Sequence, residues 1–210
     1  MSSPPPRADI PKLTDLPLRV ETAKLVLRPL EERDAETIFP IASIPDFPRW
    51  MSWNAHTSIE ETRTWLAGVV ANRQKGSDLV WAIERDGHFV GQIGLLGITW
   101  QSMAWRRDSA EIGYWVAPAV QNQGIATEAL LAATKFGFET LELHKLKIGC
   151  IVDNLASKKV IDRCAFRCIG RLEEDVWRDG RWWAHWRYEM TITEYSDISS
   201  TLRFSRPRPA

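Results

Sequence analysis

The spacing of hydrophobic positions changes near the middle of the chain. From residue 110 to residue 116, apolar side chains occupy every second position, which is the period of a half-buried strand. Pro118 ends this pattern, because proline lacks the N–H that a sheet requires. After Gly124 the apolar positions follow helical spacing. The expected buried face of this helix consists of Ile125, Ala129, Ala132, Ala133 and Phe136. The pattern therefore predicts a strand, a short loop with one glycine, and an amphipathic helix.

The same patterning predicts further elements on both sides of this unit. Strands are expected over 20–30, 79–84, 89–98, 145–152, 170–177 and 182–193, and a loop over 99–107. Asp-Gly pairs at 86–87 and 179–180 lie between apolar runs and predict two hairpins. Helices are expected to begin after Asp34, Ser58 and Asn154, which are suitable N-cap residues, and Ser58 with Glu61 matches a capping box. The order β-α-α-β-β-β-α-β-α-β-β predicts an α/β fold, a mixed central sheet with helices on both faces.

Length and composition narrow the class of protein. A chain of 210 residues suits one domain, expected over 18–196 between a Pro-rich N-terminal tail (1–17) and a C-terminal tail (197–210). Lysine plus arginine and aspartate plus glutamate both total 27, so no bulk attraction to nucleic acid or membrane is expected. The three cysteines have no metal-ligand spacing, and no apolar run is long enough for a membrane span. We expect a cytoplasmic protein without a metal.

The loop QNQGIA (121–126) is the first candidate for chemistry. A glycine-containing loop that enters a helix presents unpaired N–H groups at the positive end of the helix dipole, which is a favourable site for phosphate. Taken alone, the pattern also fits a glycine that merely turns the chain.

Three further segments extend this observation. QNQGIA fits the R/Q-x-x-G-x-G/A signature of the GNAT superfamily of acyl-CoA-dependent N-acyltransferases, and AEIGYWVAP, IVDNLASKKVIDRCAF and LRPLEERD resemble its RimJ/RimL branch. The resemblance spans roughly residues 25–194. It implies the GNAT fold, with about seven strands, and an acetyl-CoA-dependent N-acetyltransferase. The implied acceptor is a primary amine, either the N-terminal amine of a ribosomal or other protein or a small aminoacyl or amine compound.

The resemblance also assigns the residues that bind coenzyme A. In such proteins the loop amides hold the pyrophosphate, and the preceding strand pairs with the pantetheine arm. The implied contacts are Trp115, Val116, Gln121, Asn122, Gln123, Gly124, Ile125, Ala126, Thr127, Asn154 and Ser157. From the residues alone, Asn154 and Ser157 are simply a helix cap and a polar first-turn residue; by resemblance, Ser157 lies near the thioester sulfur as a catalytic residue. Many GNAT enzymes carry a tyrosine four residues later as the acid that protonates the thiolate, but this chain has Ile161 there.

The attacking amine must lose a proton, which is a task for a carboxylate. Glu111 shares a strand face with Gly113 and Trp115, and the resemblance supports it as the catalytic base and as an acceptor contact. The alternative is an ordinary strand carboxylate paired with Arg106 or Arg107. A backbone N–H near Trp115 or Val116 is the expected oxyanion donor.

Aromatic residues supply the remaining candidates. Trp50, Trp53 and His56 are interpreted either as walls of the acceptor pocket or as plugs at a helix junction. The C-terminal strands interleave tryptophan with arginine, a pattern that fits cross-strand packing better than nucleotide stacking. Two alternative functions follow: a coenzyme A-binding sensor without turnover, consistent with the missing tyrosine, and a nucleotide- or RNA-binding protein that uses these strands. Nucleic-acid binding is the less favoured partner class, and dimerisation is left open.

Overall fold

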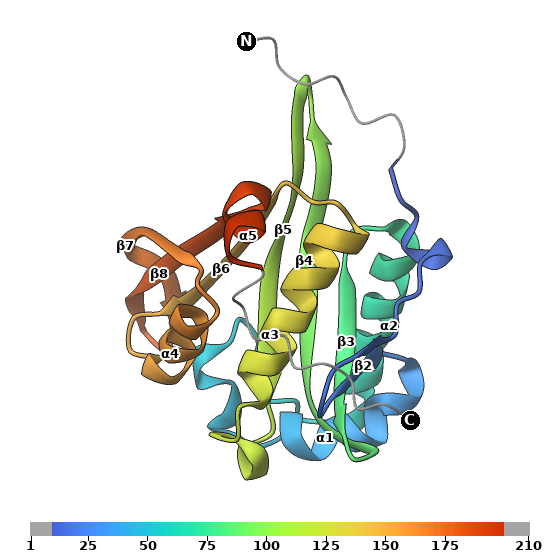
Figure 1. Ribbon diagram of the computed structural model, residues 1–210. Helices are drawn as coiled ribbons and strands as arrows, with labels where there is room; N and C mark the ends of the chain where they lie inside the picture. The colour runs from blue at the N-terminus through green and yellow to red at the C-terminus, as the bar shows by residue number, and fades with distance from the viewer. Residues whose placement is uncertain (1–9, 200–210) are drawn as a thin grey trace.

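The protein folds around one mixed sheet of eight strands, in the order β1-β2-β3-β4-β5-β6-β8-β7 (Figure 1). The structure is a computed structural model in which residues 10–199 are described. Neighbouring strands are antiparallel except for β5 and β6, which are parallel. The strands are β1 (Val20–Glu21), β2 (Val26–Pro29), β3 (Leu79–Arg85), β4 (His88–Ser102), β5 (Trp105–Val116), β6 (Lys145–Ile151), β7 (Arg167–Arg178) and β8 (Arg181–Thr191).

Helices cover both faces of this sheet. Helix α3 crosses one face in front of β4 and β5, and α1 and α2 lie on the opposite face (Figure 1). The helices are α1 (Ala35–Ala42), α2 (Ile59–Lys75), α3 (Ile125–Lys135), α4 (Leu155–Arg163) and α5 (Ile192–Ile198). The expected α/β class is therefore confirmed.

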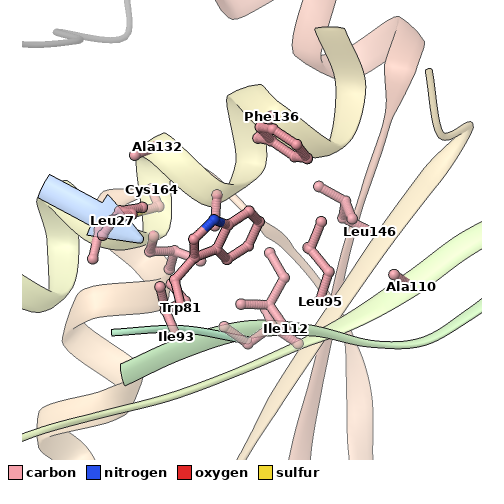
Figure 2. Packing of buried hydrophobic residues seen from close by; sticks show 14 of the residues in the cluster. Leu27, Trp81, Ile93, Leu95, Ala110, Ile112, Ala132, Phe136, Leu146 and Cys164 are labelled. Atoms are coloured by element: carbon pink, nitrogen blue, oxygen red, sulfur yellow. The ribbon is translucent and has the colours of Figure 1, made fainter. Parts of the chain in front are cut away.

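The sheet separates two hydrophobic clusters. The larger lies under α3, where the Trp81 ring meets Phe136 edge-on at a centroid distance of 5.1 Å (Figure 2). The indole N–H of Trp81 donates to the Leu18 carbonyl at 2.6 Å, so this buried polar group is satisfied. The smaller cluster lies under α1 and α2 and includes Leu66 and Trp115. The two faces of the sheet thus have separate cores.

Most of the local signals in the sequence produce the expected structure. The Ser58 hydroxyl accepts from the Glu61 N–H at 3.3 Å and caps α2, which ends at Gly76 with a φ of +76°. Both Asp-Gly pairs form hairpin turns with positive φ at both residues. The five residues expected on the buried face of α3 are all buried.

Three expectations about the elements were wrong. Residues 99–107 do not form a loop, because β4 and β5 continue as a two-stranded arm that projects beyond the rest of the sheet (Figure 1). The expected strand over 20–30 is divided into β1 and β2. The last strand ends at Thr191, where a capping box with Glu194 starts α5.

The expected tails lie only partly within the described residues. Residues 1–9 and 200–210 are outside them. Leu13, in a short 3-10 turn (Leu13–Asp15), is 2% exposed and belongs to the larger core, so part of the 1–17 segment contacts the domain. The boundaries at 18 and 196 stay predictions.

The parallel pair β5–β6 is joined over only four residues. Its pairing runs from Ser109 with Lys145 to Ile112 with Ile148 and then stops, although both strands continue. Beyond this point β6 pairs only with β8. Within the described residues, the β6-facing edge of residues 113–116 therefore has no strand partner.

Candidate functional site

The loop between β5 and α3 carries a row of free backbone donors. Gly124 adopts a φ of +82°, and Asn122 a φ of +60°, which turns the chain sharply into α3. Among the described residues, no hydrogen bond is donated by the backbone N–H groups of residues 122–127, whereas the N–H of Glu128 begins the helical pattern by donating to the Gly124 carbonyl at 3.0 Å. Several aligned, unpaired amides at a helix N-terminus form an anion site.

Two side chains attach this loop to the sheet. The Gln121 side-chain amide donates to the Val116 carbonyl at 3.1 Å, and Arg85 donates to the Gln123 side chain at 2.7 Å. Arg85 therefore places a guanidinium beside the amides. The sequence reasoning missed Arg85, because only the three-dimensional structure brings the end of β3 to this loop.

The backbone direction along β5 distinguishes the two candidates for an oxyanion donor. The Ala117 N–H donates to the Val90 carbonyl at 2.9 Å and so points toward the β4 side. Because backbone groups alternate in direction along a strand, the N–H of Trp115 also points toward β4, where Trp115 pairs with Gln92. The N–H of Val116 points to the unpaired edge. This geometry favours Val116 as the backbone donor, and Trp115 contributes its ring to the opposite core.

The N-terminus of α4 lies across this edge. The Asn154 side chain accepts from the Ser157 N–H at 3.1 Å and caps the helix, as its sequence position predicts. The Ser157 hydroxyl forms a 2.9 Å hydrogen bond with the phenol of Tyr114 on β5. Ile161, at the position where many relatives have tyrosine, is fully buried. Tyr114 was not among the expected site residues, since the strand pattern alone marks it as a core position.

The Glu111 carboxylate lies on the other face of β5 and is paired with Arg187 of β8. Its Oε1 accepts from Arg187 at 3.0 Å. The carboxylate is therefore paired with an arginine, as the alternative expects, but the partner is Arg187 and not the expected Arg106 or Arg107; Arg106 is paired with Asp108. The Glu111 side chain is 47% exposed, which leaves it accessible to a substrate.

Arg187 connects this carboxylate to a second one. It also donates to Asp175 of β7 at 3.0 Å, and His185 Nδ1 lies 3.2 Å from the same Asp175 oxygen. Burial and the nearby Arg187 charge lower the pKa of His185, and the Asp175 carboxylate opposes this shift only in part. Within the described chain no other hydrogen bond of the Glu111 side chain is seen, so the carboxylate retains an oxygen for an incoming amine.

The segment before α2 is packed against both β5 and the β7–β8 hairpin. The Phe47 ring meets Trp115 edge-on at 5.3 Å and Trp53 at 6.0 Å, and Trp50 meets Trp183 at 5.4 Å. His56 Nδ1 is 2.7 Å from the hydroxyl of the fully buried Thr62. This contact joins His56 to α2 and supports its interpretation as a helix-junction residue, and its role in an acceptor pocket stays a prediction. Trp50 and Trp53 join distant segments, and this position fits both interpretations of them.

Arg178 fixes the same segment to the tip of the hairpin. It donates to the carbonyl of Met51 and, at 3.0 Å, to the carbonyl of Trp53. Across the hairpin Trp177 pairs with Trp182, with ring centroids 5.5 Å apart. This contact is the cross-strand packing that the alternation of residues predicts.

Comparison with known proteins identifies the family. A family model described as an acetyltransferase (GNAT) domain matches residues 24–167, more than half of the chain. The chain belongs to the GNAT acetyltransferase family. This GNAT protein is 31% identical over 163 residues to the putative ribosomal N-acetyltransferase YdaF of Bacillus subtilis (strain 168), covering 74% of this chain and 82% of the relative.

Two solved structures share the fold of this GNAT protein. Mycobacterium smegmatis RimJ, in complex with a coenzyme A disulfide, is 28% identical with a TM-score of 0.71, covering 88% of this chain and 93% of RimJ. RimL, a ribosomal L7/L12 alpha-N-protein acetyltransferase in complex with coenzyme A, has a TM-score of 0.76 at 23% identity, covering 84% of this chain and 99% of RimL. The expected family, the fold and the activity of an acetyl-CoA-dependent N-acetyltransferase are confirmed. The roles of individual residues stay predictions.

Two further observations concern the expected partners. No helix in the described chain is long and apolar enough to cross a bilayer. No group of three metal-ligating side chains occurs among residues 10–199.

Proposed function

We propose that this GNAT enzyme acetylates the α-amine of a protein or peptide, with Glu111 as the base that accepts the proton of the amine. The observation that supports this most strongly is the position of Glu111, two residues before the unpaired edge of β5 and on the face opposite α3 and α4. A thioester held along that edge would have donor-binding groups on one side and this carboxylate on the other.

The residues that would hold acetyl-CoA fit its chemistry. The free amides of residues 122–127 suit a pyrophosphate, and Arg85 adds positive charge beside them. The free edge of β5 offers main-chain groups to an extended amide chain, as in peptide addition to a sheet. The Val116 N–H would stabilise the negative charge that develops on the carbonyl oxygen. Acetyl-CoA supplies the activated acetyl group.

The choice of an α-amine follows from proton affinity. An α-amine has a pKa of roughly 7.7–8.0, so about a fifth to a third of it is neutral at pH 7.4, whereas roughly one lysine amine in a thousand is neutral. The Glu111 carboxylate accepts a hydrogen bond from Arg187 through Oε1, which leaves its other oxygen for the acceptor amine. The relatives named as ribosomal N-acetyltransferases support the same acceptor class.

A thiol-release assay with matched acceptors tests the proposal. One peptide is offered with a free N-terminus and no lysine, the second with a blocked N-terminus and one lysine, and spermidine serves as a small amine. We expect the first peptide to be acetylated with the highest kcat/KM. Turnover of spermidine alone would contradict the α-amine assignment, and coenzyme A binding without turnover of any amine would support the sensor alternative.

Glu111→Gln tests the base. Glutamine retains an oxygen that accepts from Arg187 but cannot take a proton, so kcat/KM should fall by roughly 10²–10⁴ while the affinity for coenzyme A stays unchanged. The control is Glu128→Gln in the first turn of α3, whose carboxylate accepts from Thr22 at 2.7 Å. Equal loss in both variants would contradict a specific role for Glu111.

A further inference from the structure

A hydrogen bond bridges the two elements that flank the unpaired edge of β5. The phenol oxygen of Tyr114 on β5 is 2.9 Å from the hydroxyl oxygen of Ser157 on α4. Tyr114 is paired with Ile93 of β4 on one side only, because pairing with β6 has ended at Ile112. The main chain at Ser157 is fixed as well, since its N–H donates to the Asn154 side chain at 3.1 Å. The main chain that carries each hydroxyl group is therefore held by its own element.

Tyr114 remains a neutral phenol. Its side chain packs against the larger core, and burial raises the pKa of Tyr114 well above its ordinary value; the hydrogen bond to Ser157 opposes this shift only in part. A phenol whose pKa is raised keeps its proton and can act as a hydrogen-bond donor. When the phenol donates to the Ser157 oxygen, the serine O–H is left to donate elsewhere.

Within the described chain, the other titratable group beside Ser157 is the thiol of Cys150. Burial raises the pKa of the Cys150 thiol to about 11, although a hydrogen bond with Ser157 works against that rise. A thiol is a weak donor, so Cys150 does not replace the phenol. Ile161 is packed in the core and carries no polar atom. In the described structure, Tyr114 is therefore the one phenol that is hydrogen-bonded to Ser157.

We propose that Tyr114 is a positioning residue for thiolate departure: its phenol donates to the Ser157 oxygen and thereby directs the serine O–H toward the sulfur of the bound donor. This inference rests on the proposed placement of the thioester along β5. The nitrogen–carbon bond forms, the carbon–sulfur bond breaks, and its electron pair passes to sulfur. The serine O–H stabilises that charge, and the sulfur takes its proton from water. Neither hydroxyl is ionised in the step, which agrees with a phenol that resists ionisation.

The effect should be measurable on the bound product. A hydrogen bond to an anion is stronger than one to a neutral group, and a donor that is itself hydrogen-bonded is polarised further. The pair should therefore stabilise the thiolate of bound coenzyme A and lower its thiol pKa. Removing the phenol O–H should raise the pKa of the bound thiol by about one unit, a tenfold change in the thiolate fraction.

The test is a pH titration of coenzyme A bound to the enzyme, followed by thiolate absorbance and by its affinity relative to desulfo-coenzyme A. We expect Tyr114→Phe and Ser157→Ala each to raise the pKa of the bound thiol. The double variant should add little to either, because the two hydroxyls act as one unit. The control is Tyr195→Phe. Tyr195 lies on α5 and its phenol donates to Glu139 at 2.6 Å, so its removal should leave the pKa of the bound thiol unchanged.

The possible results distinguish the proposed role of Tyr114 from the proposed binding site for coenzyme A. If coenzyme A binds normally and Tyr114→Phe leaves the thiol pKa at the wild-type value, the role of Tyr114 is refuted while the donor site stands. If the wild-type protein binds no coenzyme A, the proposed donor site itself is refuted, and this inference with it. Thermal unfolding identifies a variant that has lost its fold. In that case Tyr114→Trp, which keeps an aromatic ring without the phenol, takes the place of Tyr114→Phe, and an unchanged thiol pKa in it also refutes the role.

Discussion

Replacing Gly124 by alanine tests the role of the loop 121–126, here called the donor loop, in binding coenzyme A. The effect on binding can be measured separately from the effect on stability. Gly124 has a φ of +82°, a conformation that costs an L-residue roughly 1–2 kcal/mol. A Cβ built at this position meets no atom within 4 Å, so the substitution causes strain without a clash. We therefore expect the free energy of unfolding to fall by about 1–2 kcal/mol, which lowers Tm by roughly 2–8 °C in a domain of this size.

The same chain provides a matched control. Gly76 ends α2 with a φ of +76°, and a Cβ built there also meets no atom within 4 Å. Gly76→Ala should therefore lower the stability by the same amount. Only Gly124 lies among the free amides of residues 122–127, so only its variant should lose affinity for coenzyme A.

The size of this loss follows from the hydrogen bonds involved. A hydrogen bond to a charged group contributes about 1.5–3 kcal/mol, so losing one amide–phosphate contact should weaken binding roughly tenfold to hundredfold. Calorimetric titration with coenzyme A measures the affinity, and thermal unfolding measures the stability. If Gly124→Ala and Gly76→Ala bind coenzyme A equally well at equal loss of stability, the loop amides do not hold the pyrophosphate, and the reasoning is refuted.

Three further outcomes follow from the same structure. Arg178→Ala should raise KM for the acceptor with little change in coenzyme A affinity, because the guanidinium fixes the aromatic segment before α2; steady-state kinetics with each substrate varied in turn measures this, and an unchanged KM would contradict it. Trp81→Ala should cost about 3–5 kcal/mol in chemical denaturation, since a fully buried ring is removed. Arg167 and the Thr191 N–H lower the pKa of Glu194 to about 2, so this group's contribution to stability is present above its ordinary pKa of 4.5 and is lost as the pH falls toward 2. Acid titration of Glu194→Gln should show a shallower stability loss across this window than wild type, and identical curves would refute the assignment.

Local sequence signals predicted the structure correctly where a residue type strongly favours one conformation or one position, such as a tight turn or a helix N-cap. Gly124 marked the sharp turn into α3, Asp-Gly marked both hairpins, and Ser58 marked the start of α2. Such signals depend on residues close in sequence, so patterning alone can find them. The family resemblance then supplied functions that the patterns did not.

The wrong predictions have physical causes that a local pattern does not contain, chiefly contacts between residues far apart in the sequence. The sequence pattern predicts a loop over 99–107, because a two-stranded ribbon that is exposed on both faces need not alternate apolar and polar residues. Met103 is 94% exposed and Trp105 is 70% exposed. The partner of Glu111 was placed on a neighbouring strand residue, but Arg187 lies 76 positions away and arrives through the pairing of β6 with β8. The strand pattern places Tyr114 among the alternating apolar positions, and its side chain does pack against the larger core. Its hydrogen bond to Ser157 is not visible in that pattern, because it depends on where β5 and β6 separate.

The division of the hydrophobic residues by the sheet has an evolutionary consequence. Substitutions under α1 and α2 affect packing on the face of Glu111, and those under α3 affect packing on the opposite face. A duplicated gene could therefore drift on one side and acquire a different nitrogen nucleophile while its thioester-handling side is inherited intact.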